Sequence, residues 1–172
     1  MQSGDSGANS PLIYTTGPSG GRANALLKFD FSSLPAGVTI TAAVLSLNYN
    51  GTGSGANPVG RNARVSELTQ LSWLNTATWT QFQTGYNWVT PGGDFTDVNA
   101  ADATFPASYG WMTWNVMNLC KHAQANHSEV AHFHIRDNVD SATLYGGLWE
   151  TPTAKLEITY STISVRSNIL IF

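Results

Sequence analysis

Charged residues and cysteine are both scarce in this chain. Lysine and arginine supply 8 of the 172 residues and aspartate and glutamate supply 11, so 11% are charged and the net charge is −3. Ordinary soluble domains carry roughly 25% charged residues. No basic run is present, which excludes nucleic acid as a partner because phosphate neutralisation requires clustered cations. The single cysteine, Cys120, excludes an internal disulfide and a Cys-x-x-Cys metal site, and its apolar neighbours predict a buried thiol.

Long hydrophobic runs are also missing. No stretch approaches the roughly 20 apolar residues that a membrane helix requires, so no membrane partner is expected. The first residues lack the basic and apolar segments of a secretory signal. We therefore expect either that the chain works without export through that route or that it is an excised module.

Small polar residues and strand-forming residues take the place of charge. Glycine, serine, threonine and asparagine together make up 65 of the 172 residues, while 42% of the chain is apolar and 11% aromatic. Lysine and glutamate favour surface helices, whereas threonine, tyrosine, tryptophan and valine fit pleated sheets. The apolar fraction is large enough to build one folded domain, and the composition predicts that this domain is all-β.

Alternating apolar residues mark the strands. One face of each predicted strand is apolar in the following sets: Leu27, Phe29 and Phe31; Ala43, Leu45, Leu47 and Tyr49; Ala63, Val65 and Leu68; Ala131, Phe133 and Ile135; Leu156, Ile158 and Tyr160. A period of two with glycine, proline and asparagine turns between the sets is typical of antiparallel strands. The pattern predicts a two-sheet antiparallel sandwich with one short helix over residues 115–124.

Four pieces of sequence in a fixed order carry a family resemblance. They are ALLKFDFSSLPAGVTITAAVLSL (25–47), SWLNTATWT with WVTPGGDFT (72–80 and 88–96), GWMTWNVMNL (110–119) and PTAKLEITY (152–160). Together they resemble DNRLRE-type, disaggregatase-related β-sandwich domains, which are grouped with carbohydrate-binding modules. The resemblance covers residues 22–160 and implies a jelly-roll-like sandwich that binds or displays without a reaction of its own. The chain departs from the family at Leu144–Glu150, where members often carry Tyr-Ser-Ser-Arg-Glu-like residues.

Two terminal segments flank this predicted domain. Residues 1–21 are rich in glycine and serine and are expected to form an N-terminal arm. Residues 161–172 form a C-terminal extension that ends in four apolar residues, Ile169, Leu170, Ile171 and Phe172. Such a run would be an aggregation hazard if exposed. It must be buried, either as an additional strand of this domain or against a neighbouring subunit, and these residues are the candidate assembly contacts.

The sequence His132-Phe133-His134 is the sharpest local motif. Alternation places both imidazoles on one face of a strand, about 7 Å apart, a spacing that suits two ligands of one metal ion. A third ligand would have to come from Glu129, Asp137 or Asp140. Zinc sites usually show three or four protein ligands, so we expect no metal centre and place both histidines on the outer face of a sheet.

The acidic residues Asp94, Asp97 and Asp102 gather in a loop-rich stretch that could chelate Ca²⁺. They lack the regular spacing of a calcium loop, and aspartate is common in turns, so no cofactor is predicted and Ca²⁺ is the one candidate ion. His122 and His127 bracket the end of the predicted helix, where imidazole can meet free carbonyl groups. No chemistry is assigned to them.

Aromatic residues divide into core and surface candidates. Three tryptophans with apolar neighbours are expected in the core or under loops: Trp79, Trp88 and Trp114. Tyr145 and Trp149 stand beside paired glycines and are expected to be exposed rings, which can stack on sugars or anchor a protein. Together with His132 and His134 they form the predicted carbohydrate-binding site.

No complete catalytic constellation is present in the sequence. There is no Gly-x-Ser-x-Gly nucleophile motif, and the glycine-rich stretch 51–55 lacks the lysine and the helix of a phosphate-binding loop. We therefore predict no catalytic residues and no enzymatic activity.

Two functional hypotheses remain. The first is a structural or decoration protein of a larger assembly, most plausibly on the surface of a phage capsid, with coat subunits or its own copies as partners. The second is a carbohydrate-binding module that attaches to a polysaccharide, in a virion or as part of a secreted extracellular protein. Contacts between the terminal arms and other copies would favour the first hypothesis, and packing of the arms on their own domain would favour the second.

Overall fold

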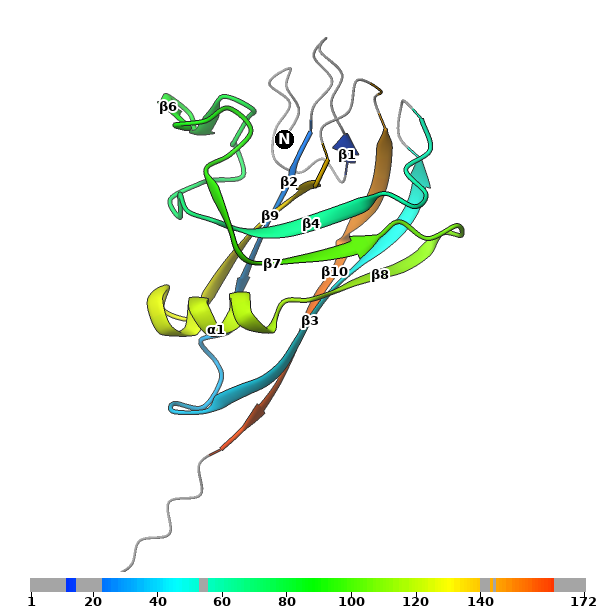
Figure 1. The fold of residues 1–172 in the computed structure, drawn as a ribbon. Coiled ribbons are helices and arrows are strands. Elements are labelled where there is room, and N and C mark those ends of the chain that lie inside the picture. Colours follow the sequence, from blue (N-terminus) through cyan, green and yellow to red (C-terminus); the bar gives the residue numbers. More distant parts are fainter. Residues whose placement is uncertain (1–11, 15–22, 53–55, 140–142, 144, 163–172) are drawn as a thin grey trace, which may run out of the picture.

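Two four-stranded antiparallel sheets form the body of the protein (Figure 1). The computed structural model describes residues 12–14, 23–52, 56–139, 143 and 145–162. Sheet A has the order β1 (Leu12–Tyr14), β10 (Gly146–Ser161), β3 (Thr39–Thr52) and β8 (Gly110–Asn115). Sheet B has the order β2 (Ala25–Asp30), β9 (Val130–Asp137), β4 (Asn62–Leu68) and β7 (Phe95–Thr104). The predicted all-β sandwich is confirmed.

The strands pair in a nested pattern. Strand β4 pairs with β7, β3 with β8, β2 with β9 and β1 with β10, and every pair is antiparallel. Successive pairs alternate between sheet B and sheet A. A long antiparallel ribbon wrapped across two sheets in this way is the jelly-roll arrangement, so the predicted jelly-roll-like topology is also confirmed.

The main core lies between the two sheets and is built by the predicted inward faces. It includes Ala43, Leu45, Leu47 and Tyr49 of β3 together with Ala131, Phe133 and Ile135 of β9. The indole rings of Trp114 and Trp149 meet edge to face in this core, with their centroids 5.9 Å apart. Ile40 of β3 joins the same core beyond a register shift in the β3–β10 pairing. Because side chains alternate along a strand, the residues between these core positions point away from it.

A second, smaller core covers the outer face of sheet B. The covering loop, defined here as residues 69–94, contains the short strands β5 (Gln81–Gln83) and β6 (Tyr86–Asn87). Its side chains join two strand residues in one cluster that consists of Leu26, Leu68, Trp73, Ala77 and Trp88. Trp88 is therefore buried under a loop and Trp114 lies in the main core, as predicted, while Trp79 is partly buried. Sheet B thus has an apolar layer on its inner face and on part of its outer face.

One helix, α1 (Met117–Asn126), packs on β3 of sheet A and β9 of sheet B, and it runs beside β7 and β8 in Figure 1. It begins two residues later than predicted because Asn115 still pairs with Val44 in the β3–β8 ladder. The buried helix residues are Leu119, Cys120 and Ala123. Burial raises the pKa of the Cys120 thiol to about 12, so the predicted buried thiol is confirmed.

The first described segment of the chain pairs with β10 in sheet A. Leu12–Tyr14, within the segment expected to form a separate arm, pair with Gly146–Leu148 at the edge of the sheet. Strand β10 continues to Ser161. The predicted assembly contacts, Ile169–Phe172, lie outside the described residues. Within the described part of the chain, no helix combines the length and the apolar character needed to span a membrane.

Candidate functional site

His132 lies on the outer side of sheet B, as alternation predicts, but the covering loop buries it. Only 6% of its surface is exposed. The indole Nε1 of Trp73 donates a hydrogen bond to His132 Nδ1 over 2.9 Å. Burial, with a smaller contribution from the positive charge of Lys28, lowers the pKa of His132 to about 4. The prediction that His132 contacts a carbohydrate at the surface is wrong, because Trp73 occupies its open side.

His134 is enclosed even more completely. Its Nε2 lies 3.0 Å from the side-chain nitrogen of Asn24 and 2.9 Å from the carbonyl oxygen of Gly92. The ring of Phe95 stacks on the imidazole with centroids 4.4 Å apart. Burial lowers the pKa of His134 to about 3. His134 is therefore a neutral, structural histidine, and its predicted part in a sugar site is also wrong.

Asp137, one of the candidate third ligands, is paired with an arginine instead. Arg61 donates from Nε to one carboxylate oxygen of Asp137 over 2.8 Å and from a terminal nitrogen to the other over 3.0 Å. This bidentate pair fixes Asp137 at the far end of β9. Asp140 lies outside the described residues. Among the described residues, no carboxylate joins His132 and His134 in a group of three possible metal ligands.

The three acidic residues considered for Ca²⁺ have different partners. Asp94 accepts hydrogen bonds from the backbone N–H groups of Val89 and Thr90, over 3.0 and 2.8 Å, and so closes a turn of the covering loop. Asp97 and Asp102 lie on β7 and face arginines instead. The structure therefore does not bring the three carboxylates together as one calcium site.

An ionic ladder crosses the outer face of sheet B at these positions. Arg64 binds Asp102 over 2.8 Å, and Arg136 binds Asp97 over 2.7 Å. Ser66 donates its hydroxyl proton to Asp97 over 2.6 Å. Burial alone would raise the pKa of Asp97, but the Ser66 hydroxyl and Arg136 outweigh it and lower the pKa overall. The hydrogen bond from Arg64 likewise lowers the pKa of Asp102.

Trp149 is a core residue and not an exposed ring. Only 1% of its surface is exposed, and its indole stacks on Phe105 with centroids 5.4 Å apart. The prediction that Trp149 stacks on sugars is wrong. Tyr145 is half-buried, and the guanidinium of Arg61 lies 4.2 Å from its ring centroid. The two residues therefore do not form a shared aromatic platform.

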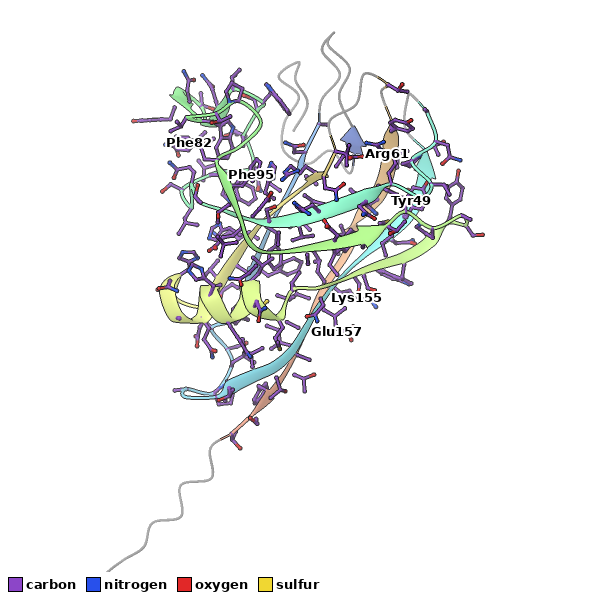
Figure 2. The ribbon with its side chains drawn as sticks, in the orientation of Figure 1. Tyr49, Arg61, Phe82, Phe95, Lys155 and Glu157 are labelled. Carbon is purple, nitrogen blue, oxygen red and sulfur yellow. The ribbon has the colours of Figure 1, made fainter. Side chains whose placement is uncertain are left out.

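The most exposed tryptophan on a sheet face is Trp111 of β8, with 49% of its surface exposed. Its neighbours Met112 and Trp114 point into or towards the core, so its indole lies on the outer face of sheet A. The ammonium of Lys155 lies 4.4 Å from the ring centroid. Lys155 and Glu157 lie two residues apart on β10, where Figure 2 labels both. Trp111 was not among the candidate site residues identified from the sequence.

Polar side chains surround Trp111 on that face. Asn48 is its direct cross-strand partner on β3, and the adjacent row runs from Thr113 through Ser46 to Lys155. Direct cross-strand neighbours lie close enough for their side chains to act on one ligand. We call these five residues, Trp111, Asn48, Thr113, Ser46 and Lys155, the sheet A face. It presents one ring and one cation beside polar side chains, of which Ser46 is buried.

A groove of about 510 Å³ lies on the opposite side of the molecule's two-sheet body, between the covering loop and β7. Its lining includes Gln70, Val89, Thr90 and Phe95. Phe95, labelled in Figure 2, contributes a ring that is already held by His134 on one side and by the Arg136 guanidinium 4.6 Å from its centroid. Phe95 and Trp111 each carry one cation, but the imidazole stacked on Phe95 takes up further ring surface, so the groove is a weaker candidate than the sheet A face.

His122 and His127 have a role that sequence reasoning did not assign. Both rings face the carboxylate of Glu67, which comes from β4, more than fifty residues earlier in the chain. No short motif links these three residues, so only the fold brings them together.

No protein-family model matches the chain, and no curated protein matches it. Membership of the DNRLRE-type domains therefore stays a prediction that rests on the four quoted pieces of sequence. The confirmed jelly-roll-like sandwich agrees with that prediction but is shared by many unrelated proteins.

Proposed function

We propose that this protein is a non-enzymatic, DNRLRE-like binding module that attaches to a polysaccharide through the sheet A face. The observation that carries the proposal is the half-exposed indole of Trp111 beside the ammonium of Lys155. Aromatic rings stack on the apolar faces of sugars, and a rigid sheet holds such a ring at little entropic cost.

The neighbours of Trp111 carry polar groups that can hydrogen-bond to a sugar. Asn48 offers amide donor and acceptor groups, and Thr113 offers a hydroxyl group that can donate and accept. A sugar stacked on the indole would place its hydroxyl groups over these side chains, because they occupy adjacent positions on the same face. The site thus combines ring contact with hydrogen bonds, as ligand sites usually do.

Lys155 indicates an acidic polysaccharide. Its side chain is exposed, and its flexible stem lets the ammonium leave the indole and meet a sugar carboxylate. The net charge of the chain is −3, so general attraction to a polyanion is not expected. Binding of an acidic chain would therefore depend on this local cation.

Two further observations support a binding module without catalysis. Burial lowers the pKa of both His132 and His134, and both rings are covered by packed side chains instead of facing an open cleft. Leu12–Tyr14 of the expected arm pair with the protein's own sheet, which favours an independent module over an arm that reaches another subunit.

Affinity electrophoresis in gels that contain alginate, polygalacturonate or a neutral glucan tests the proposal. We expect retention in the acidic gels, loss of retention for Trp111→Ala, and a selective loss in acidic gels for Lys155→Gln. Tyr86→Ala is the matched control, because Tyr86 is an exposed ring on β6. Absence of retention across all gels, or retention that Trp111→Ala leaves unchanged, would refute the proposal.

A second proposal, decoration of a phage capsid at the virion surface, is favoured by the four apolar residues Ile169–Phe172. An apolar strand-forming tail can add to a sheet edge of a coat subunit or of a second copy. Deletion of residues 169–172 should then reduce the oligomeric mass measured by light scattering. An unchanged mass would count against this role without affecting the glycan-binding proposal.

A further inference from the structure

Two histidines and one glutamate converge where the end of α1 meets sheet B. Glu67 belongs to β4, His122 lies in the second half of α1, and His127 directly follows the helix. Nδ1 of His122 lies 2.9 Å from Oε1 of Glu67, and Nδ1 of His127 lies 3.0 Å from the same oxygen. The three ligand atoms all lie within 4.8 Å of one another.

Glu67 occupies an unusual position for a carboxylate. Along β4 the residues Ala63 and Val65 face the main core, and alternation places Glu67 on the same side. Its side chain is 9% exposed. A carboxylate in such a place is costly unless a cation or several hydrogen bonds compensate it.

Hydrogen bonding alone does not account for this cluster. The His122 nitrogen has hydrogen-bond geometry to Glu67. Nδ1 of His127 is buried and has no hydrogen-bond partner in the described part of the chain, although it lies close to the same carboxylate oxygen. The two imidazole rings stand nearly perpendicular, at 83°, with centroids 5.2 Å apart. A cation between the three groups would give Nδ1 of His127 the partner that no hydrogen bond supplies.

The backbone after His127 is held in an uncommon conformation that positions the ring. Ser128 and Glu129 both have positive φ angles, 51° and 64°, and this left-handed region is unfavourable for residues other than glycine. The turn is fastened by hydrogen bonds from Glu129 N–H to the Ala123 carbonyl and from Phe31 N–H to the Glu129 carbonyl. Such local strain collects at ligand sites, where the surroundings enforce it.

We propose that Glu67, His122 and His127 bind one Zn²⁺ ion. Imidazole nitrogen and carboxylate oxygen are ordinary zinc ligands, with bonds of about 2.0–2.2 Å. Tetrahedral geometry places such ligand atoms roughly 3.3 Å apart, so the contacts at 2.9 and 3.0 Å need to open by only a few tenths of an ångström. Mg²⁺ and Ca²⁺ prefer oxygen ligands and fit this set poorly.

Three protein ligands leave a fourth position for water. The His122 side chain is 41% exposed, so an ion and its water can reach the cluster from solvent. The bound ion would fasten the end of α1 to β4. Because the unfolded chain does not hold these ligands together, binding would stabilise the folded state.

Isothermal titration of the chelator-treated full chain with Zn²⁺ tests the site, with Ca²⁺ titrated in parallel. We expect one Zn²⁺ per chain and no Ca²⁺ binding. Thermal unfolding should shift upwards by roughly 5–10 °C when free Zn²⁺ is 100 times its Kd. Co²⁺ in place of Zn²⁺ should give the visible absorption bands of a tetrahedral site. Absence of Zn²⁺ binding would overturn the proposal.

Substitutions locate the ion. His122→Gln and Glu67→Gln should each weaken Zn²⁺ binding by more than the ~10–100-fold that loss of an outer-shell partner causes. Lys121→Gln, an exposed neighbour on α1, is the control and should bind as the natural chain does. Circular dichroism without metal verifies that each variant is folded. Unchanged Zn²⁺ binding in both site variants would assign the ion to other residues and refute this site.

Discussion

The indole of Trp73 donates its Nε1 proton to Nδ1 of His132 over 2.9 Å. Because an indole nitrogen can only donate, Nδ1 of His132 must carry a lone pair, and the neutral ring must hold its proton on Nε2. The contact therefore selects one tautomer of His132 and opposes its protonation. A loop far from β9 in sequence thus determines the ionisation of a strand residue.

Stability should fall in mildly acidic solution because of His132 and His134. Burial lowers their pKa values to about 4 and about 3, below the ordinary value of about 6.5. The unfolded chain therefore takes up protons that the folded chain refuses, from about pH 6.5 downwards. Each histidine lowers the free energy of unfolding by up to about 1.4 kcal/mol per pH unit across this window. Urea unfolding at pH 7, 6, 5 and 4.5 measures the loss.

A variant isolates the contribution of His134. His134→Gln should unfold at lower urea concentration at pH 7 but should show a shallower loss of stability between pH 6.5 and 4.5. The lowered pKa values of Asp97 and Asp102 act below about pH 4, outside this window. Equal slopes for the natural chain and the variant would contradict the assignment of the pH dependence to His134.

Trp149→Ala should destabilise the protein strongly. The indole is fully enclosed between Phe105 and Trp114, and its removal leaves a large cavity that costs about 3–5 kcal/mol. Trp111→Ala is the matched comparison, because half of that ring is exposed; we expect a loss under about 1 kcal/mol. Chemical denaturation measures both. Similar losses for the two variants would contradict the assigned burial.

Cys120 should resist thiol reagents in the native protein. Burial raises the pKa of its thiol to about 12, and the thiolate is the reactive form. Ellman's reagent should therefore react fully in denaturant and, under native conditions, only as fast as the protein opens. Rapid native labelling would show that the N-terminal half of α1, where Cys120 lies, is open to solvent.

Gly147→Ala should disturb the stacked rings next to β10. A Cβ at this position would lie 2.5 Å from Phe105 Cε1 and 2.7 Å from Phe105 Cζ, so the ring that supports Trp149 would have to move. Such overpacking typically costs 1–3 kcal/mol. Gly37→Ala cannot serve as the control, because Gly37 has a positive φ that alanine rarely adopts. Ala154→Gly is the comparison variant, because Ala154 also lies on β10 but is only partly buried. Thermal unfolding measures both, and an unchanged Tm for Gly147→Ala would contradict this packing.

Alternation in the sequence predicted the main core because the buried faces of β3 and β9 repeat apolar residues every second position. The same alternation placed His132 and His134 correctly on the outer side of sheet B. The alternation could not show that the covering loop packs on this side. A period of two distinguishes the two faces of a strand, but it does not reveal which other segment covers each face. The covering loop has little regular pattern, and its contacts with sheet B are long-range.

The exposed aromatic residues were predicted less well than the core residues. The paired glycines before Trp149 suggested an exposed ring, whereas they belong to β10 and Gly147 leaves room for Phe105. Trp111 could have been found from the sequence, since Trp114 was expected in the core and Trp111, an odd number of residues away, must face outwards. The Glu67–His122–His127 cluster could not, because its members lie 55 and 60 residues apart and meet only through the folded chain.

The nested pairing of the strands determines the order in which the molecule can assemble during synthesis. Strand β3 lies between β8 and β10 in sheet A, so both of its neighbours are translated long after it. The outermost pair joins Leu12–Tyr14 to residues near the other end of the chain. Nonlocal pairing of this kind gives slow folding, in the range of milliseconds to seconds. Sheet A can therefore close only after β10, the last strand to be translated among those described, has been made.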